Sequence, residues 1–236
     1  MWPVREAYWR SRIRKCTPRR EADLIEHALS LAKQDTSDRL SKTVREMEGM
    51  SGQRYRTFIN ILINSLGAEA SYLEVGSWKG STAAAALEGN RGHAVCIDNW
   101  SQFGGPKEEF LQNIGSTRLD GVSLEILEED FRRIDFDRLG RFNVYLFDGP
   151  HEEQDQHDGI MLAQPALADP HVLIVDDWNW PQVRIGTFRA ICESGWRVGY
   201  SAEIRTTHDN RHAPVRGKDS DWHNGYLIAL LQRQAA

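Results

Sequence analysis

The stretch from residue 72 to residue 81 is the feature that most constrains how this chain can fold. A short apolar run ends at Glu74 and Val75, Gly76 and Gly80 follow, and strong helix formers occupy residues 82–87. This order predicts a buried strand, a tight turn and the start of a helix. Because Gly76 lacks a Cβ, a ligand could approach the backbone there, and the free N–H groups of the helix start would face a carboxylate or a ribose.

Glu74 distinguishes this turn from a dinucleotide-binding turn. A carboxylate repels a pyrophosphate but suits a cationic or amino-bearing ligand, and the glycine spacing differs from the three-glycine pattern of dinucleotide binders. The stretch resembles the first motif of class I S-adenosylmethionine (SAM) methyltransferases, whose ligand carries a sulfonium and an amino group. The resemblance implies that SAM contacts Glu74, Gly76, Ser77, Gly80 and Ser81. A plain strand–glycine–helix corner is the alternative explanation.

Composition narrows the class of protein. The chain has 236 residues, of which 40% are hydrophobic and 27% charged, as in an ordinary soluble globular protein with one domain or one domain and an appendage. A net charge of −5 argues against a nucleic-acid or anionic-membrane partner. No apolar run approaches the roughly 20 residues of a membrane span, no signal peptide is visible, and three scattered cysteines suggest neither disulfides nor zinc. We therefore expect a cytoplasmic protein.

The N-terminal region reads as a helical arm or cap over residues 1–68, followed by a catalytic domain over residues 69–236. Residues 1–20 are basic and aromatic; they form either a lid or dimer arm, or a solvated helical arm that packs its aromatic side chains on the domain, which we favour. Apolar residues at helical spacing predict helices from about residue 20 to 33 and from residue 51 to Gly67. The loop at Met50, Ser51 and Gly52 either covers the cofactor pocket or simply starts a helix.

From residue 71 onward the pattern alternates between apolar strands and helices. Expected strands are 72–75, 93–97, 122–127, 142–147, 171–175, 196–202 and 225–231, and expected helices are 81–87, one led by Pro106, 152–167 and 183–193. Near-continuous apolar strands argue for a parallel sheet covered on both faces. We predict an α/β fold: a Rossmann-like, doubly wound, mostly parallel seven-stranded sheet with an antiparallel final hairpin. The polar loop 206–221 is expected to be mobile.

Carboxylates follow the ends of successive strands. In open α/β sheets, ligands bind beyond the carboxyl ends of the strands, near the point where the strand order reverses. Asp98, with Asn99 and Trp100 after it, stands where a ribose-binding acid is expected, although it could also cap the following loop. Asp130 and Phe131 could bind the adenine ring, with Glu128 and Glu129 competing for the acidic role.

The carboxylates after the fourth and fifth strands predict a metal site. Asp148, Asp176 and Asp177 would supply hard oxygen ligands, which suit Mg²⁺ better than zinc. Such a cluster repels itself unless a cation or protons neutralise it. His151 follows Asp148 by three residues, and its imidazole suits a general base near neutral pH.

These two acidic segments sharpen the resemblance. Residues 72–195 resemble the metal-dependent small-molecule O-methyltransferases, including those that methylate macrolide and aminocoumarin sugars. The resemblance implies that Asp148, Asp176 and Asp177 hold Mg²⁺, that Asp148 also borders SAM, and that His151 is the catalytic base. The first 70 residues match only loosely, as expected of a region that sets substrate specificity.

The function predicted from these features is SAM-dependent, Mg²⁺-assisted O-methylation of a small hydroxylated molecule, such as a natural product or a sugar. Two alternatives stay open: hydroxylase-like chemistry on the same fold and metal site, and a non-catalytic SAM-fold interaction protein. A homodimer or higher homo-oligomer is also left open. Of the remaining candidates, His157 is expected on a surface helix. In or beside the polar loop, His208, His212 and His223 either approach the substrate or, as is more common for loop histidines, are solvated. Trp178 and Trp180 either form a substrate wall or pack at a helix entry.

Overall fold

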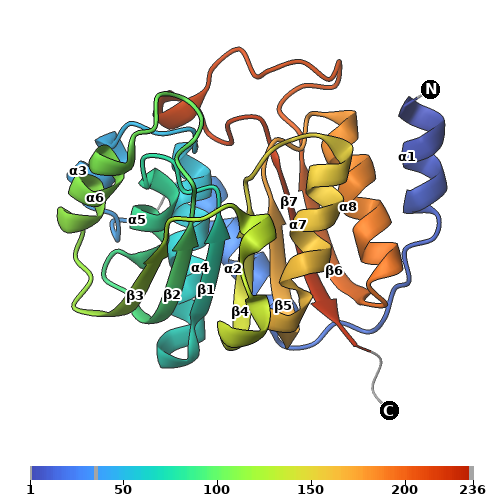
Figure 1. The fold of residues 1–236 in the computed structure, drawn as a ribbon, viewed down its shortest axis with the longest axis horizontal. Coiled ribbons are helices and arrows are strands. Elements are labelled where there is room, and N and C mark those ends of the chain that lie inside the picture. The colour runs from blue at the N-terminus through green and yellow to red at the C-terminus, as the bar shows by residue number, and fades with distance from the viewer. Residues whose placement is uncertain (1, 35–36, 234–236) are drawn as a thin grey trace.

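A seven-stranded sheet forms the centre of the protein, with the strands in the order β3-β2-β1-β4-β5-β7-β6 (Figure 1). The computed structural model describes residues 2–34 and 37–233. The strands β1 to β5 are parallel, and β7 runs antiparallel to both β5 and β6. This arrangement confirms the predicted fold. The strand bounds are β1 Ser71–Val75, β2 Arg91–Ile97, β3 Gly121–Leu127, β4 Phe142–Phe147, β5 Leu167–Val175, β6 Arg197–Ile204 and β7 Tyr226–Gln232.

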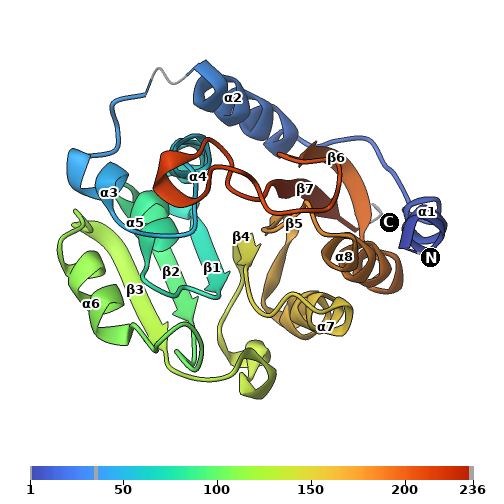
Figure 2. The same cartoon turned by 90° about the horizontal axis from the view of Figure 1, so that it is seen from above.

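Helices cover both faces of the sheet. Figure 2 shows α2, α4 and α5 on one face and α7 and α8 on the other, with α1 outside α8. Each face has its own hydrophobic core. The α-helices are α1 Trp2–Arg10, α2 Glu21–Gln34, α3 Lys42–Glu46, α4 Gln53–Leu66, α5 Ser81–Leu87, α6 Lys107–Gly115, α7 Glu153–Ala163 and α8 Pro181–Glu193; short 3₁₀ turns are η1 Gly67–Glu69, η2 Phe131–Arg133, η3 Phe136–Arg138, η4 Gln164–Ala166 and η5 Gly217–Asp219.

The order of the strands places a crevice at the edge between β1 and β4. The chain winds from β1 through β2 to β3 on one side and from β4 to β5 on the other, so β1 pairs with both β2 and β4. Loops that leave neighbouring strands in opposite directions open a space beyond their carboxyl ends. This edge lies at the top of Figure 1 and faces the viewer in Figure 2.

Several element boundaries differ from the predicted ones, most clearly around Pro165 and Pro106. The helix expected over residues 152–167 ends at Ala163, because Pro165 in the following turn lacks an N–H and the chain tightens into η4. Leu167 then begins β5, four residues before the predicted start at His171. Pro106 caps α6 instead of occupying its first turn.

The N-terminal helices differ in how deeply they pack. Helices α2 and α4 share a hydrophobic core with the sheet, and Tyr55, Phe58 and Ile59 of α4 are completely buried. In contrast, α1 has no buried residue. The division between an arm over residues 1–68 and a domain over residues 69–236 stays a prediction. Within the described ranges, no helix is long and apolar enough to cross a membrane.

Candidate active site

The turn after β1 brings two loops together at the crevice. Gly76 has φ +91°, and a Cβ on it would lie 1.9 Å from the backbone oxygen of Asp148. Its N–H donates to the Ile97 carbonyl at 2.9 Å. The space beside Gly76 is therefore taken by the loop after β4. A contact of Gly76 with a cofactor stays a prediction. A glycine is required there because the left-handed backbone and the close approach both exclude a side chain.

The serines of this turn make the contacts that close it. The Ser81 hydroxyl pairs with the Ser51 hydroxyl at 3.1 Å, so the 50–52 loop lies against the start of α5. The Ser77 hydroxyl is buried and has no partner among the residues that the structure describes. Gly80 has φ +81°, and a Cβ there would meet the Phe110 ring at 2.8 Å.

Glu74 lies beneath the turn and is completely buried. One carboxylate oxygen accepts a hydrogen bond from the Tyr72 hydroxyl, and the other has no partner in the described part of the chain. Burial raises the pKa of Glu74 to about 7, against the lowering effect of the neighbouring Tyr72 and Ser77 hydroxyls. Protein atoms cover the Glu74 carboxylate, and its direct contact with a cofactor stays a prediction.

Asp98 joins two loops through its carboxylate. One oxygen accepts the N–H of Trp78 at 2.7 Å and the other accepts the N–H of Trp100 at 2.6 Å. The Trp100 indole in turn donates to the Trp78 carbonyl at 2.8 Å. Asp98 therefore caps the loop that follows it, which was the alternative to ribose binding. Its carboxylate keeps further lone pairs that could accept ribose hydroxyls. Asn99 turns to its own loop and accepts the Ser101 N–H at 3.0 Å.

The pair after β3 is engaged in the protein's own packing. Asp130 caps η2 by accepting the Arg132 N–H at 2.9 Å. Phe131 packs edge-on against Phe147 with ring centroids 5.3 Å apart, and the Arg132 guanidinium covers its ring at 4.3 Å. A contact of this pair with adenine stays a prediction.

The loops after β4 and β5 bring together the carboxylates that the sequence pointed to. Ligand atoms of Asp148, His151 and Asp177 lie within 4.8 Å of one another, and so do those of Asp176, Asp177 and His223. His151 Nε2 lies 2.9 Å from Asp177 Oδ2. Asp177 has φ +55°, and its N–H donates to the Asp176 carboxylate at 2.7 Å. Asp148 also joins the cluster to the turn after β1, because its N–H donates to the Val75 carbonyl at 2.9 Å.

Electrostatics in this cluster favours a bound cation. Burial first, and then repulsion from the neighbouring carboxylates, raises the pKa of Asp148 well above its usual range, and the pKa of Asp176 rises for the same reasons. Burial acts on Asp177 as well, but hydrogen bonds from His151 and Asn224 outweigh it and lower the pKa of that carboxyl. Without a cation, protons must neutralise part of the cluster. The donor set of carboxylate oxygens fits Mg²⁺.

Two residues of this site were missed by the sequence analysis. His223, expected to be solvated, is only 6% exposed, and Asn224 donates to the second Asp177 oxygen at 2.6 Å. Their position just before β7 could have revealed both residues, because an antiparallel strand starts at the edge of the sheet where the parallel strands end. His223 Nδ1 accepts the Gly217 N–H at 2.9 Å, so in the neutral ring Nε2 carries the proton. A neutral His223 ring in this tautomer offers no lone pair to a metal ion.

The other predicted histidines and tryptophans separate into buried and exposed groups. His157 is also buried rather than solvated, and it lies 2.8 Å from Glu193, whereas His208 is exposed. Trp178 is completely buried against Phe188 and belongs to the core.

Trp180 belongs to the site. Its ring meets His151 edge-on at 5.1 Å and His212 at 5.0 Å. It lines a shallow hollow of about 480 Å³ together with Gln182, Asn210, Arg211 and His212. An aromatic side chain therefore borders the acidic cluster on its solvent side.

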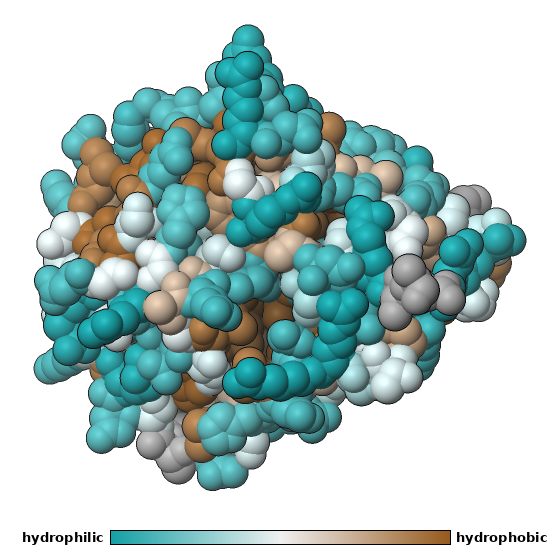
Figure 3. Space-filling model, turned by 90° about the horizontal axis from the view of Figure 1, so that it is seen from below, coloured by the Kyte–Doolittle hydropathy of each residue, from teal (hydrophilic) through white to brown (hydrophobic). Residues whose placement is uncertain are grey.

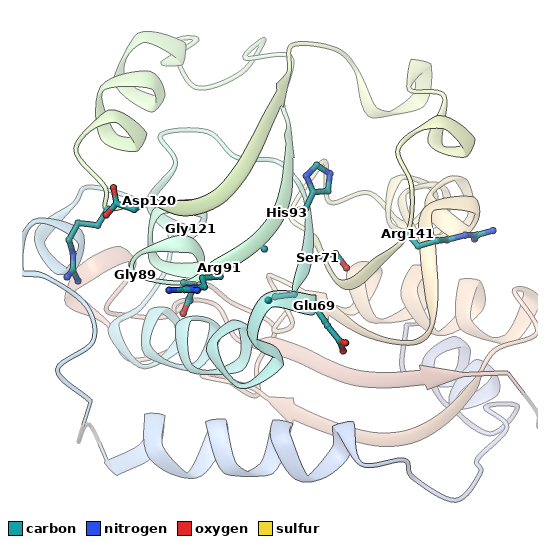
Figure 4. Close-up of a pocket in the computed structure, with 13 residues that line it drawn as sticks. Glu69, Ser71, Gly89, Arg91, His93, Asp120, Gly121 and Arg141 are labelled. Carbon is teal, nitrogen blue, oxygen red and sulfur yellow. The ribbon is translucent and has the colours of Figure 1, made fainter.

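A larger hollow of about 900 Å³ lies at the opposite edge of the sheet, around the first residues of β1, β2 and β3. Figure 4 shows Arg91 and Asp120 on one side of it and Arg141 on the other. The space-filling view from this side shows hydrophobic patches between hydrophilic side chains (Figure 3). None of its lining residues belongs to the acidic cluster, so this hollow is separate from the candidate site.

Comparison with known proteins agrees with this geometry. Residues 73–178 match the family model of a methyltransferase domain, a range that begins in β1 at the crevice and ends just after Asp176 and Asp177. The chain carries a SAM-dependent methyltransferase domain. No curated protein matches the sequence.

Solved structures share the fold of this methyltransferase domain at low sequence identity. An O-methyltransferase from Bacillus cereus in complex with SAH is 15% identical, with a TM-score of 0.50 over 89% of this chain and 91% of that one. TomG, an O-methyltransferase from Streptomyces achromogenes involved in tomaymycin synthesis, is 13% identical, with a TM-score of 0.51 over 87% and 89%. A protein from Pyrococcus horikoshii described as a candidate RNA methyltransferase is 13% identical, with a TM-score of 0.53 over 89% and 96%. The fold alone therefore does not choose the acceptor.

Proposed function

We propose that this methyltransferase domain transfers a methyl group from SAM to a hydroxyl of a small molecule, with a divalent cation, Mg²⁺, bound by Asp148, Asp176 and Asp177. The observation that carries the proposal is the meeting of Asp148, His151 and Asp177 within 4.8 Å at the crevice. A buried cluster of acids next to an imidazole is costly for stability, and it is most simply explained by a cation and a proton acceptor that act on one substrate.

The roles of the residues follow from their contacts. A cation held by the three carboxylates would lower the pKa of a hydroxyl that it contacts. His151 donates its Nε2 proton to Asp177, which leaves the Nδ1 lone pair to accept the hydroxyl proton. Nδ1 is buried without a partner among the described residues, so the acceptor would reach it by displacing the atoms that cover it. Trp180, edge-on to this ring, limits its rotation. Asp177 thus both holds the cation and orients the base.

The cofactor is assigned to the β1–β3 side of the same crevice. SAM supplies the electrophilic methyl group, and a partly exposed Asp98 and the turn that it stabilises are suited to bind its ribose and its amino-acid end. Glu74 would act from beneath the turn instead of touching the ligand. The proposed contacts are Gly76, Ser77, Gly80, Ser81, Asp98, Asn99, Trp100, Asp130, Phe131 and Asp148.

A small acceptor is favoured over RNA by charge. The chain has a formal net charge of −5, and the candidate site itself is acidic, so a polyanion would be repelled. The hollow beside Trp180 and His212, of about 480 Å³, suits a small ring-shaped molecule. The two O-methyltransferases with this fold, from Bacillus cereus and Streptomyces achromogenes, support the choice of an oxygen acceptor.

The test is formation of S-adenosylhomocysteine from SAM with a panel of phenolic and sugar hydroxyl compounds, with Mg²⁺ or with EDTA. We expect turnover that requires the metal, and His151→Gln should lower kcat by about 100-fold or more while SAM affinity stays unchanged. His208→Gln, in an exposed loop, is the matched control.

Three results would argue against the proposal. Full activity in EDTA would remove the metal from it, and unchanged kcat in His151→Gln would remove the base. An oxidised product without S-adenosylhomocysteine would favour the hydroxylase-like alternative, and SAM binding without turnover on any acceptor would favour the non-catalytic one.

A further inference from the structure

Helix α1 is attached to the protein mainly by charged side chains. None of its residues is buried, yet three of them make ion pairs with other elements. Arg5 pairs with Glu153 at 2.5 Å, Glu6 with Arg184 at 2.8 Å and Arg10 with Glu203 at 2.5 Å. Figures 1 and 2 both show α1 alongside α8, at the end of the sheet formed by β6. Two of these pairs continue inward to the loop that carries Asp176 and Asp177.

The first connection passes through Arg184 of α8. Its guanidinium is almost completely buried and donates to the backbone carbonyls of Trp178 and Asn179, at 3.0 and 2.7 Å. The same guanidinium donates to Glu6 at 2.8 Å and to Asn210 at 3.2 Å. Trp178 and Asn179 immediately follow Asp177, so Arg184 fixes the backbone at the exit of the acidic pair. Glu6 is the only carboxylate that the structure shows paired with this buried cation within the described residues.

The second connection passes through Glu203 of β6. Its carboxylate accepts two hydrogen bonds from Arg10, at 2.5 and 2.8 Å, and one from the Trp178 indole at 2.9 Å. Arg10 therefore holds the acceptor that orients Trp178. Both connections from α1 therefore reach Trp178, and the first also reaches Asn179.

The loop after β5 needs such support because its backbone is strained. Asp177 has φ +55°, a left-handed conformation that a residue with a Cβ adopts at a cost of about 1–2 kcal/mol. Such a conformation persists where the surroundings over-determine it. The buried Asn179 side chain adds the 206–211 loop to the same network, since its oxygen accepts the N–H groups of Thr206 and Thr207 at 2.9 and 3.2 Å.

We propose that Glu6 and Arg10 are positioning residues of the active site, and that α1 holds the Asp177–Asn179 backbone in the conformation that points the acidic pair into the crevice. The residues act through Arg184 and Glu203, and neither touches the site itself. The inference rests on the proposed function only for the role of that loop in catalysis. The mechanical connection stands on the contacts alone.

The test uses Glu6→Gln and Arg10→Gln in the full chain. Hydrogen–deuterium exchange of the metal-free protein should show about tenfold faster exchange over residues 177–181 and 206–211 in each variant, because a hydrogen bond between charged groups contributes about one decade in a local opening equilibrium. Matched controls are Glu26→Gln on the exposed face of α2 and Arg12→Gln, which contacts the Tyr8 ring. Both controls should exchange like the wild type in these segments.

A Mg²⁺ titration then separates positioning from general loosening. Both test variants should bind Mg²⁺ about three- to tenfold more weakly and show a lower kcat with an unchanged Kd for SAM, whose site lies on the other side of the crevice. Glu6→Asp, which keeps the charge, should restore part of the loss.

The proposal is overturned if both variants exchange over these segments at the wild-type rate, or if exchange rises equally throughout the sheet. Circular dichroism checks folding, and if Glu6→Gln does not fold, Arg10→Gln decides, since the Arg10 side chain is 44% exposed. A wild-type protein that binds no Mg²⁺ would contradict the metal in the proposed function, whereas the exchange result would still decide the role of α1.

Discussion

Replacing Asp148 with asparagine tests the electrostatics of the candidate site most directly. The asparagine amide has the shape of a protonated carboxyl group and can donate the same hydrogen bond to Asp176. It lacks the negative charge, so it cannot contribute to repulsion within the cluster or hold a cation strongly. The variant should therefore be more stable than the wild type without metal and unable to use the metal.

The magnitude follows from the distances. Ligand atoms of Asp148 and Asp177 lie within 4.8 Å, and two like charges at that separation repel by about 3 kcal/mol at an effective dielectric constant of about 20. Protonation of Asp148 relieves part of this repulsion in the wild type, so we expect a gain of about 2 kcal/mol at pH 8. For a chain of this length that corresponds to a Tm about 4–8 °C higher.

The sign of the pH dependence is fixed by the direction of the pKa shift. Burial and neighbouring carboxylates raise the pKa of Asp148 in the folded protein. Its contribution to stability is therefore fully present below the pKa of the unfolded chain and is lost as pH rises through the folded pKa. Asparagine has no such loss, so the advantage of Asp148→Asn should be small at pH 4, close to the pKa of an Asp in the unfolded chain, and should grow as the pH rises above that value.

Thermal unfolding in EDTA at pH 4, 6 and 8, repeated with Mg²⁺, measures this effect. Mg²⁺ should raise the Tm of the wild type and leave Asp148→Asn unchanged, and Asp120→Asn at an exposed position on the other edge should follow the wild type throughout. An Asp148→Asn variant less stable than the wild type at pH 8 in EDTA would refute the reasoning, because the ionised carboxylate would then be stabilising.

Three further predictions concern the residues around the crevice. Gly76→Ala should lower the free energy of unfolding by about 3 kcal/mol, because the new Cβ would lie 1.9 Å from the Asp148 carbonyl oxygen and the backbone has φ +91°. Chemical denaturation measures this free energy. The control is Gly115→Ala, whose Cβ would meet no atom within 4 Å. The free energy of unfolding of the wild type should fall by about 3 kcal/mol between about pH 4.5 and 7, because burial raises the pKa of Glu74 to about 7 and its contribution is lost as pH rises through that value. Glu74→Gln should not show this fall. His223→Ala should speed amide exchange at Gly217 about tenfold, because that N–H loses its acceptor.

Each of these predictions has an outcome that contradicts it. Equal stability of the two glycine variants would mean that the loop after β4 moves away from Gly76 at little cost. A pH profile of Glu74→Gln parallel to that of the wild type would show that Glu74 stays ionised when folded. Unchanged exchange at Gly217 would mean that other contacts hold η5 without His223.

The order of strands and helices could be predicted from local sequence because each element has its own periodicity and end signals. The run of residues 142–147, with five of its six residues buried, reads as a strand wherever it is placed, and its acidic successor Asp148 marks the end. Once the sheet is parallel, the carboxyl ends of neighbouring strands share one edge, so the approach of Asp148 to Asp177 also followed from sequence. The ends of helices were harder to predict than the strands. At Pro165, the sequence did not show that α7 ends at Ala163 and that a 3₁₀ turn follows.

Contacts between residues far apart in the chain could not be predicted from local sequence. The position of His223 and Asn224 depends on the antiparallel return of β7, and the link from Glu6 to Arg184 joins residues 178 positions apart. The structure also adds roles for single residues that the sequence did not indicate. Gly76 accommodates the Asp148 backbone, and Glu74 lies under the turn beside Tyr72.

The sequence by itself determined the fold, the edge of the sheet that carries the chemistry and the acids that gather there, because strand periodicity and strand ends are local properties. Only the tertiary structure decided which side chains are buried, which groups the ring nitrogens of His151 and His223 contact and which distant residues support the loop after β5. Those properties depend on desolvation and on hydrogen bonds between segments that the chain brings together only when it folds.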